Sequence, residues 1–355
     1  MPTRSGVATP LAFMPLAGAS SAPVRPLIRR IITGFLLLLV LLAAAGFLYE
    51  NIAEARDRRF NRMPGILINV SGYKMHLHCT GEGTPTVILD SGLGDSYVSW
   101  RKVQPEIAKL SRVCSYDRAG LGYSEPSPGP RTSQAIAEQL HALLQSASVS
   151  PPYVIVGHSM GGYDVRIFTS LYRNEITGIV LVDSSHPDQE NRFPPKLKKM
   201  ESSFLREAEF LEYTTPVGLP RLMGMCDEDP VVRAAECNFH SAREGVEELK
   251  AFPESAAQAA ATGSLGDLPL AVLSQDPDKP SSELPPDLAK PVSQEWANMQ
   301  EELAHLSTRG TRTIAKNSAH YIQLDRPDVV IDAVWSVVEQ ARQAQGSSGQ
   351  HPHRP

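Results

Sequence analysis

Several features that would narrow the class of this 355-residue chain are scarce or missing. Four cysteines are too few for a disulfide framework in a chain of this length. Because 34 lysines and arginines stand against 39 acidic residues, with a formal net charge of −5, nucleic acid is not expected as a partner. The sequence has no internal repeat and no long run of one charge sign. It does have 42% hydrophobic residues, which is enough for a sizeable core.

One long apolar run lies near the N-terminus, from Ile31 to Tyr49. It carries no charge, and at about 1.5 Å per residue it covers most of a hydrocarbon core. The lysine and arginine counts of its two flanks are equal, but the cluster RPLIRR at 25–30 favours a cytoplasmic N-terminus and an extracytoplasmic body. The alternative is secretion after signal-peptide cleavage near AEA, at Ala53–Ala55. Since the apolar run exceeds the usual signal-peptide core of about 7–15 residues, an uncleaved single-pass anchor is favoured.

The rest of the chain alternates between strand-like and helix-like patterns. Several strand-like runs, such as TVILDSG and ITGIVLVD, are apolar throughout, which predicts an α/β fold with a mostly parallel, doubly wound sheet. The segment after the sixth strand is too long for a loop and has helical patterns, so a helical cap over the strand ends is expected. The predicted order is a cytoplasmic basic segment (1–30), a transmembrane helix (31–49), a stalk (50–64), an α/β core (65–183 and 266–344), a helical cap (184–265) and a disordered tail (345–355).

A serine between glycines is the clearest chemical signal. In VIVGHSMGGYD, Ser159 follows an apolar strand pattern and precedes a helical one. The string G-x-S-x-G occurs by chance in other chains, but this context is the one that a nucleophile elbow requires. Small neighbours then let the strand and helix approach, and the serine oxygen is presented at a helix N-terminus.

Four motifs together resemble those of the α/β-hydrolase superfamily. GHSMGG resembles the elbow, ILDSGLGDSYVSW the oxyanion loop, YDRAGLGYSEP the Asp-Arg-x-Gly-x-Gly-x-Ser segment, and NSAHYIQLDRPDVV the histidine loop. The resemblance covers nearly everything from Gly65 to Ala344. It implies the α/β-hydrolase fold and the chain order nucleophile, acid, histidine.

The resemblance identifies His320 as the general base. Of ten histidines, it directly follows the last short strand pattern, where it can reach Ser159. Ala319 departs from the glycine that the family commonly has before this histidine.

Two residues compete for the acid of the triad. Asp278, in QDPD, matches the family's usual loop after the seventh strand, with Asp276 nearby. Asp183 ends the strand ITGIVLVD, where some family members place their acid. Asp183 is favoured because a strand end holds a side chain rigidly, and Asp278 remains the alternative.

The resemblance also implies an oxyanion hole built from the backbone N–H groups of Met160 and Leu93. No cofactor and no metal site are expected, because the motifs lack metal-ligand and phosphate-loop patterns. Apolar residues of the expected cap are candidates for an acyl pocket, although packing between cap and core explains them more simply: Leu205, Phe210, Leu211 and Met223.

A serine nucleophile with two backbone donors suits acyl transfer, so the predicted function is hydrolysis of small-molecule carboxylic esters. A serine at the elbow argues against dehalogenation and epoxide hydrolysis, for which the superfamily uses an aspartate at this position. The alternatives are a ligand-binding protein with little turnover, or an amidase or peptidase, lactonase or acyltransferase.

The four cysteines are expected to be reduced. Cys79 and Cys114 lie in strand-like runs and have the character of small buried apolar residues. If the body lies outside the cell, Cys226 and Cys237 have the spacing to pair across a short loop.

Overall fold

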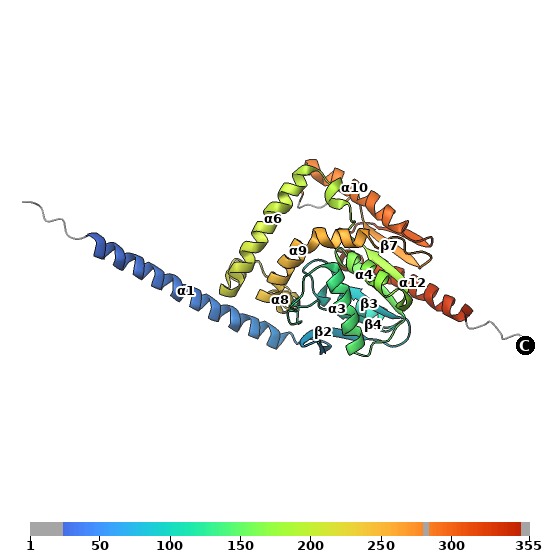
Figure 1. The fold of residues 1–355 in the computed structure, drawn as a ribbon, viewed down its shortest axis with the longest axis horizontal. Coiled ribbons are helices and arrows are strands. Elements are labelled where there is room, and N and C mark those ends of the chain that lie inside the picture. The colour runs from blue at the N-terminus through green and yellow to red at the C-terminus, as the bar shows by residue number, and fades with distance from the viewer. Residues whose placement is uncertain (1–23, 280–283, 349–355) are drawn as a thin grey trace, which may run out of the picture. The chain divides into compact units, whose positions relative to one another are not determined.

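A computed structural model describes residues 24–279 and 284–348 (Figure 1). The chain divides into two compact units, one ending at Ala45 and one beginning at Gly46. Helix α1 (Val24–Phe60) contains the expected transmembrane segment and most of the expected stalk. Among the described residues it is the one helix long and apolar enough to cross a membrane, by length and composition. Most of the expected basic segment, residues 1–23, lies outside the described residues.

The second unit is built on one sheet, which confirms the predicted fold class. Its order is β1-β2-β4-β3-β5-β6-β7-β8, and every pairing from β4 to β8 is parallel, while β1 and β2 are antiparallel. The strands are β1 (Ile66–Val70), β2 (Tyr73–Thr80), β3 (Thr86–Asp90), β4 (Val113–Tyr116), β5 (Tyr153–His158), β6 (Ile176–Val182), β7 (Leu270–Gln275) and β8 (Gly310–Ala315).

Apolar clusters cover both faces of this sheet. Along β5, Ile155 belongs to one cluster and Val154 and Val156 to the other, because successive side chains of a strand point to opposite faces. Helices α3 (Ser133–Ser146) and α4 (Gly161–Leu171) pack on the first face, and α12 (Pro327–Ser348) on the second. Burial on both faces explains why the strands of the sheet centre are apolar throughout.

The ends of two helices bear on the sequence predictions. Thr132 caps α3 by accepting a hydrogen bond from the N–H of Ala135, as threonine often does before the first turn of a helix. Helix α12 continues to Ser348, so residues 345–348 are helical where a disordered tail was expected. The remainder of that tail, 349–355, lies outside the described residues.

The segment between β6 and β7 is helical. Its longest helices, α6 and α9, pack against each other, and α9 also contacts α3 and α4 (Figure 1). The elements are α5 (Gln189–Arg192), α6 (Pro195–Thr214), the 3₁₀ helix η3 (Thr215–Val217), α7 (Leu219–Leu222), α8 (Pro230–Glu236) and α9 (Phe239–Ala260). The other short helices are η1 (Tyr97–Trp100), α2 (Gln104–Ile107), η2 (Arg173–Glu175) and α11 (Ile322–Asp325), and α10 (Pro286–Ala304) precedes β8.

The expectation of reduced cysteines is wrong. All four are paired in the structure, Cys79 with Cys114 and Cys226 with Cys237. The antiparallel register of β2 and β4 sets Cys79 directly opposite Cys114, with a Cα–Cα distance of 4.0 Å. The composition does not reveal this pairing, because it depends on strand register.

Candidate active site

Ser159 lies at the tight turn between β5 and α4. Its φ of +53° is in the left-handed region, which is uncommon for a residue with a side chain. A methyl group on Gly157 would collide with the backbone carbonyl of Gly161, so glycine is needed where strand and helix approach. The N–H of Ser159 donates to the carbonyl of Val182, 3.2 Å away at the end of β6. The serine is therefore held beside the next strand, on a corner with the geometry of an elbow.

Asp183 follows β6 directly and is fully buried. Its Oδ1 accepts hydrogen bonds from the backbone N–H of Gln275 at 2.8 Å and from Nε1 of Trp296 at 2.9 Å. Its Oδ2 lies 2.7 Å from Nδ1 of His320. Three donors thus fix the orientation of this carboxylate.

His320 lies in the loop between β8 and α11. With the carboxylate of Asp183 accepting from Nδ1–H, the lone pair of the neutral ring is on Nε2, the tautomer that a general base needs. The His320 ring lies 4.7 Å from the ring of His158, centroid to centroid, and its backbone carbonyl accepts from Nε2 of His158 at 3.2 Å. Since His158 precedes Ser159, these contacts hold His320 beside the elbow.

His158 itself is buried, and burial followed by the nearby His320 holds its pKa well below the ordinary value. His158 is therefore neutral at pH 7 and acts as a hydrogen-bond donor to the loop, without competing for the proton that a base at His320 would take.

The alternative acid lies elsewhere. Asp278 is mostly exposed, and its carboxylate lies 3.4 Å from Nζ of Lys316. Asp276 lies 3.1 Å from the same Nζ and accepts from the backbone N–H of Asn317, a hydrogen bond that is the main cause of its lowered pKa. The structure thus brings Asp183 to His320, whereas Asp276 and Asp278 order the turn around Lys316.

The expected oxyanion donors lie on two elements. Met160 is buried and caps the N-terminus of α4, and Leu93 lies half-buried in the loop after β3. Nη1 of Arg118 donates to the carbonyl of Ser91 at 2.7 Å, and Nη2 donates to that of Gly92. The buried side chain of Arg118 therefore holds the loop that carries Leu93 through hydrogen bonds to the two residues before it.

Arg118 is the centre of a buried charge network that the motif search did not assign. Its guanidinium lies 3.1 Å from Asp90, 3.5 Å from Asp164 and 2.8 Å from Glu248 of α9. Burial works to lower the pKa of Arg118, but Glu248 and Asp90 outweigh it and keep the group charged. Burial also raises the pKa of Asp90 to about 6, against the effect of Arg118. The sequence signal for this network was the arginine in the glycine-rich segment YDRAGLGYS. The network could not be predicted from it, because the partners of Arg118 lie far away in the sequence.

A second unassigned pair lies near the histidine loop. The hydroxyl of Tyr321 donates to Oδ1 of Asp95 at 3.2 Å, which links this loop to the one that carries Leu93. Burial raises the pKa of Asp95 to about 6, and Arg118, Tyr321 and His320 oppose that effect.

A cavity of about 380 Å³ lies next to Leu93. Of the four apolar candidates, Leu205 lines it, whereas Leu211 lines a different cavity and Phe210 and Met223 are exposed. The cavity is formed by the Leu93 loop and by helices α5, α6 and α9, and its residues are Leu93, Gln189, Glu190, Lys198, Glu201, Ser202, Leu205, Leu249, Phe252 and Pro253.

Comparison with known proteins agrees with this architecture. The family model described as alpha/beta hydrolase fold matches residues 85–214. An uncharacterized Bacillus subtilis protein, YqjL, is 28% identical over 76% of this chain and 89% of its own length. Epoxide hydrolase 4 of Mus musculus is 23% identical over 78% of this chain and 79% of its own. A thermophilic esterase from Thermogutta terrifontis superposes with a TM-score of 0.57 at 21% identity, covering 78% of this chain and 98% of the esterase.

Proposed function

Because this chain belongs to the α/β-hydrolase superfamily, we propose that it is a hydrolase of carboxylic esters that acts through an acyl-serine intermediate. The observation that carries the proposal is the contact of 2.7 Å between His320 and Asp183, in a loop that packs against the residue preceding Ser159. A histidine oriented by a buried carboxylate beside an elbow serine is the arrangement that activates a hydroxyl group.

The chemistry assigned to each residue follows from these positions. Nε2 of His320 takes the hydroxyl proton of Ser159 as the oxygen attacks the ester carbonyl. The N–H groups of Met160 and Leu93 stabilise the oxyanion that forms. His320 then returns the proton to the alcohol leaving group, and water, deprotonated by the same nitrogen, releases the acid from the serine. Asp183 keeps the ring oriented and stabilises the imidazolium that forms in each half-reaction.

Serine as the elbow residue favours ester hydrolysis over the epoxide hydrolysis named for the mouse relative. An alkoxide leaves with less help from the acid than an amine does, so esters are preferred to amides. The cavity beside Leu93 supports a small acyl group, since about 380 Å³ lies at the lower end of the range for small-molecule sites.

The test combines labelling and turnover. The solubilised full chain should react rapidly with a fluorophosphonate probe at Ser159, and it should hydrolyse p-nitrophenyl esters with a preference for short or medium acyl chains. Folded protein that neither labels nor turns over would favour the ligand-binding alternative. Labelling without ester turnover would move the proposal to amide, lactone or acyl-transfer chemistry.

We further propose that α1 anchors the protein in a membrane with its N-terminus in the cytoplasm and its catalytic body outside. The apolar length of α1 supports the anchor. Two disulfides in the second unit support an oxidising compartment for the body. Protease digestion of intact cells or spheroplasts should degrade the body, and protection of the body until the membrane is permeabilised would reverse this orientation.

A further inference from the structure

The turn that contains α7 lies against the end of the apolar run in α1. We define the α7 turn as residues Thr215–Met225. A side chain at Gly46 would collide with the backbone carbonyl of Val217, and one at Gly218 would crowd the ring of Tyr49. Glycines at such contacts let two backbones approach closely. The α7 turn is therefore fixed at the level of residues 46–49.

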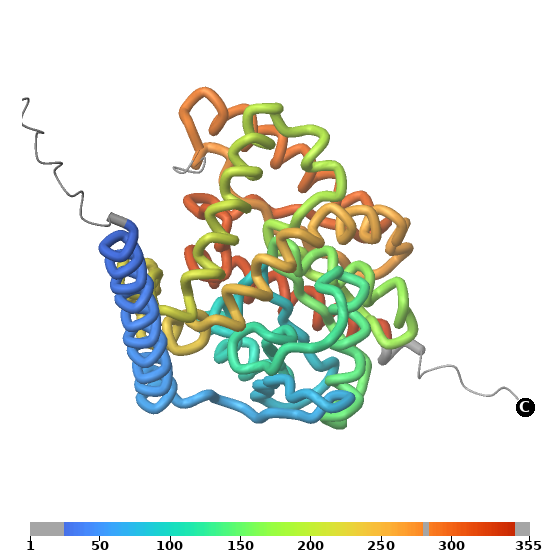
Figure 2. The backbone as a smooth tube through the Cα atoms, turned by 60° about the vertical axis from the view of Figure 1, so that its left-hand side comes forward, coloured from blue at the N-terminus to red at the C-terminus, as the bar shows by residue number. Residues whose placement is uncertain are grey.

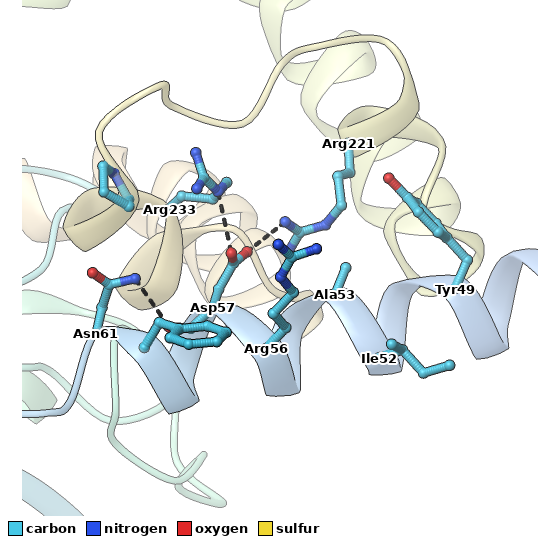
Figure 3. A pocket seen from close by; sticks show the side chains of 10 residues that line it. Tyr49, Ile52, Ala53, Arg56, Asp57, Asn61, Arg221 and Arg233 are labelled. Carbon is cyan, nitrogen blue, oxygen red and sulfur yellow. Dashed lines mark hydrogen bonds and ion pairs between the residues drawn. The ribbon is translucent and has the colours of Figure 1, made fainter.

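Buried ion pairs hold this contact in register. The guanidinium of Arg221 donates from Nε to Glu50 at 2.9 Å. It also donates from Nη1 to Asp57 at 2.6 Å (Figure 3). Asp57 also lies 3.4 Å from Nε of Arg233. The side chains of Arg221 and Glu50 are only 9% and 6% exposed, so water does not screen the pair. One arginine that binds two carboxylates about two helical turns apart prevents the α7 turn from sliding along α1.

Exposed apolar side chains lie on both sides of this contact. Phe47 and Leu48, at the end of the apolar run, are 57% and 61% exposed. In the α7 turn, Leu222, Met223 and Met225 are 65%, 61% and 47% exposed. Exposed apolar clusters of this kind mark an interaction surface. If α1 crosses a bilayer, lipid covers Phe47 and Leu48, and the α7 turn lies at their depth.

Along α1, the residues after Phe47 and Leu48 follow the order that is typical of a membrane interface, an aromatic residue first and then an arginine. Tyr49 ends the apolar run, and Arg56 follows about 10 Å further along the helix. Both line a cavity of about 710 Å³ with Arg221 and Arg233, and Figure 3 shows these two arginines reaching toward the helix that carries Tyr49 and Arg56. Aromatic residues at the edge of the apolar layer and arginines beyond it are typical of bilayer surfaces. In Figure 2 the backbone of the α7 turn lies beside the part of α1 that belongs to the second unit, where Gly46 and Tyr49 make the contact.

We propose that the α7 turn is a second membrane contact, which inserts Leu222, Met223 and Met225 into the interface of a lipid bilayer. The inference rests on α1 as the anchor and does not depend on the reaction at Ser159. Apolar burial at the interface stabilises such a contact. With both α1 and the α7 turn at the surface, the helical insert is held against the membrane.

The test uses single free thiols, since the four native cysteines are paired. Met223→Cys is labelled with an environment-sensitive nitrobenzoxadiazole dye in the full chain, reconstituted into phosphatidylcholine–phosphatidylglycerol vesicles that contain doxyl-labelled lipid. Phe47→Cys marks the apolar end of α1, and Ala55→Cys marks a level about 12 Å further along it. Leu171→Cys at the end of α4 is the matched control, because it is another exposed apolar residue.

The dyes at 223 and 47 should show blue-shifted emission that is quenched by doxyl lipid, while those at 55 and 171 should be neither shifted nor quenched. A dye at 223 that behaves like the one at 171 overturns the proposal. A blue shift at 223 without quenching also overturns it, because protein, such as a second copy of the chain, would then cover the turn. Leu222→Cys repeats the measurement if Met223→Cys does not fold.

Discussion

Nδ1 of His320 lies 2.7 Å from Oδ2 of Asp183, although 137 residues separate the two along the chain. Parallel strands explain the meeting, since β6 and β8 both end at the same edge of the sheet, on either side of β7. The Trp296 indole and the Gln275 amide occupy the other carboxylate oxygen, so Asp183 has one orientation available. The pair thus fixes the imidazole ring of His320 in one orientation, with Nδ1 directed at the carboxylate.

Replacing the elbow serine tests the nucleophile. Ser159→Ala should reduce ester hydrolysis by at least about a thousandfold, because no other group supplies the attacking oxygen. The melting temperature should change little, since alanine tolerates the positive φ no worse than serine. Ser203→Ala, at an exposed position of α6, serves as the control and should retain full activity. A purified Ser159→Ala protein that keeps a substantial rate would remove this residue from the mechanism.

The two aspartates should behave differently. Asp183→Asn should lower kcat by about ten-thousandfold, because the amide would favour the wrong tautomer of His320. Asp278→Asn should leave kcat within a few-fold of the wild type, because that side chain is exposed beside Lys316. Steady-state kinetics of both variants on one ester give the comparison. Equal and mild losses would mean that neither aspartate orients the base.

The buried network around Arg118 should support both stability and the oxyanion loop. In Glu248→Gln, an amide would face Arg118, Arg131 and the N–H of Gly94, three donors that now bind the carboxylate. Breaking a buried ion pair costs about 3–5 kcal/mol, so the variant should be less stable and should show a lower kcat with a smaller change in KM. Denaturant unfolding and kinetics measure the two effects.

Glu247→Gln is the matched control for this experiment, because Glu247 is only half-buried and, within the described part of the chain, pairs with the exposed Lys250. It should change neither stability nor kcat appreciably. A Glu248→Gln protein with normal stability and a normal kcat would show that the network does not position the loop.

Glu236 should make stability depend on pH. Burial, with Asp95 as the next cause, raises its pKa from 4.5 to about 7. The folded protein therefore holds this proton more tightly than the unfolded chain does. The stability that protonated Glu236 contributes is fully present below about pH 4.5 and is lost as pH rises toward 7. Glu236→Gln should flatten the pH dependence of the melting temperature in that window. Glu228→Gln, at an exposed position, should leave the profile unchanged, and an identical profile for Glu236→Gln would contradict the assignment.

The cysteine pairing is open to direct measurement. Protein unfolded in iodoacetamide without reductant should show no alkylated cysteine by mass spectrometry, and four after reduction, because both pairs are closed. Alkylation of any cysteine before reduction would show an open pair in the isolated protein and weaken the case for an oxidising compartment.

The parts of the fold that depend on local pattern were predictable. The apolar runs that form β3, β5 and β6 stand out because both faces are buried, and the elbow around Ser159 has a local glycine requirement. The local sequence pattern could not decide between Asp183 and Asp278 as the acid. It depends on which strand end faces His320, which the order of strands in the sheet determines.

The remaining features depend on contacts between distant segments. The pairing of Cys79 with Cys114 needs the β2–β4 register, and Arg118 meets Glu248 across 130 residues. Hydrophobic periodicity carries no information about such pairs. A buried arginine implies that carboxylates lie near it, but the sequence does not identify them.

The ion pair between Glu50 and Arg221 has a consequence for maturation. A leader peptidase that cut after Ala55 would remove Glu50, together with Gly46, against which the backbone carbonyl of Val217 packs. Arg221 would keep Asp57 but lose its two-point contact, and the underside of the α7 turn would open to water. Proteolytic release would therefore damage the domain that it sets free, because the part of α1 from Gly46 onward is packed into the second unit.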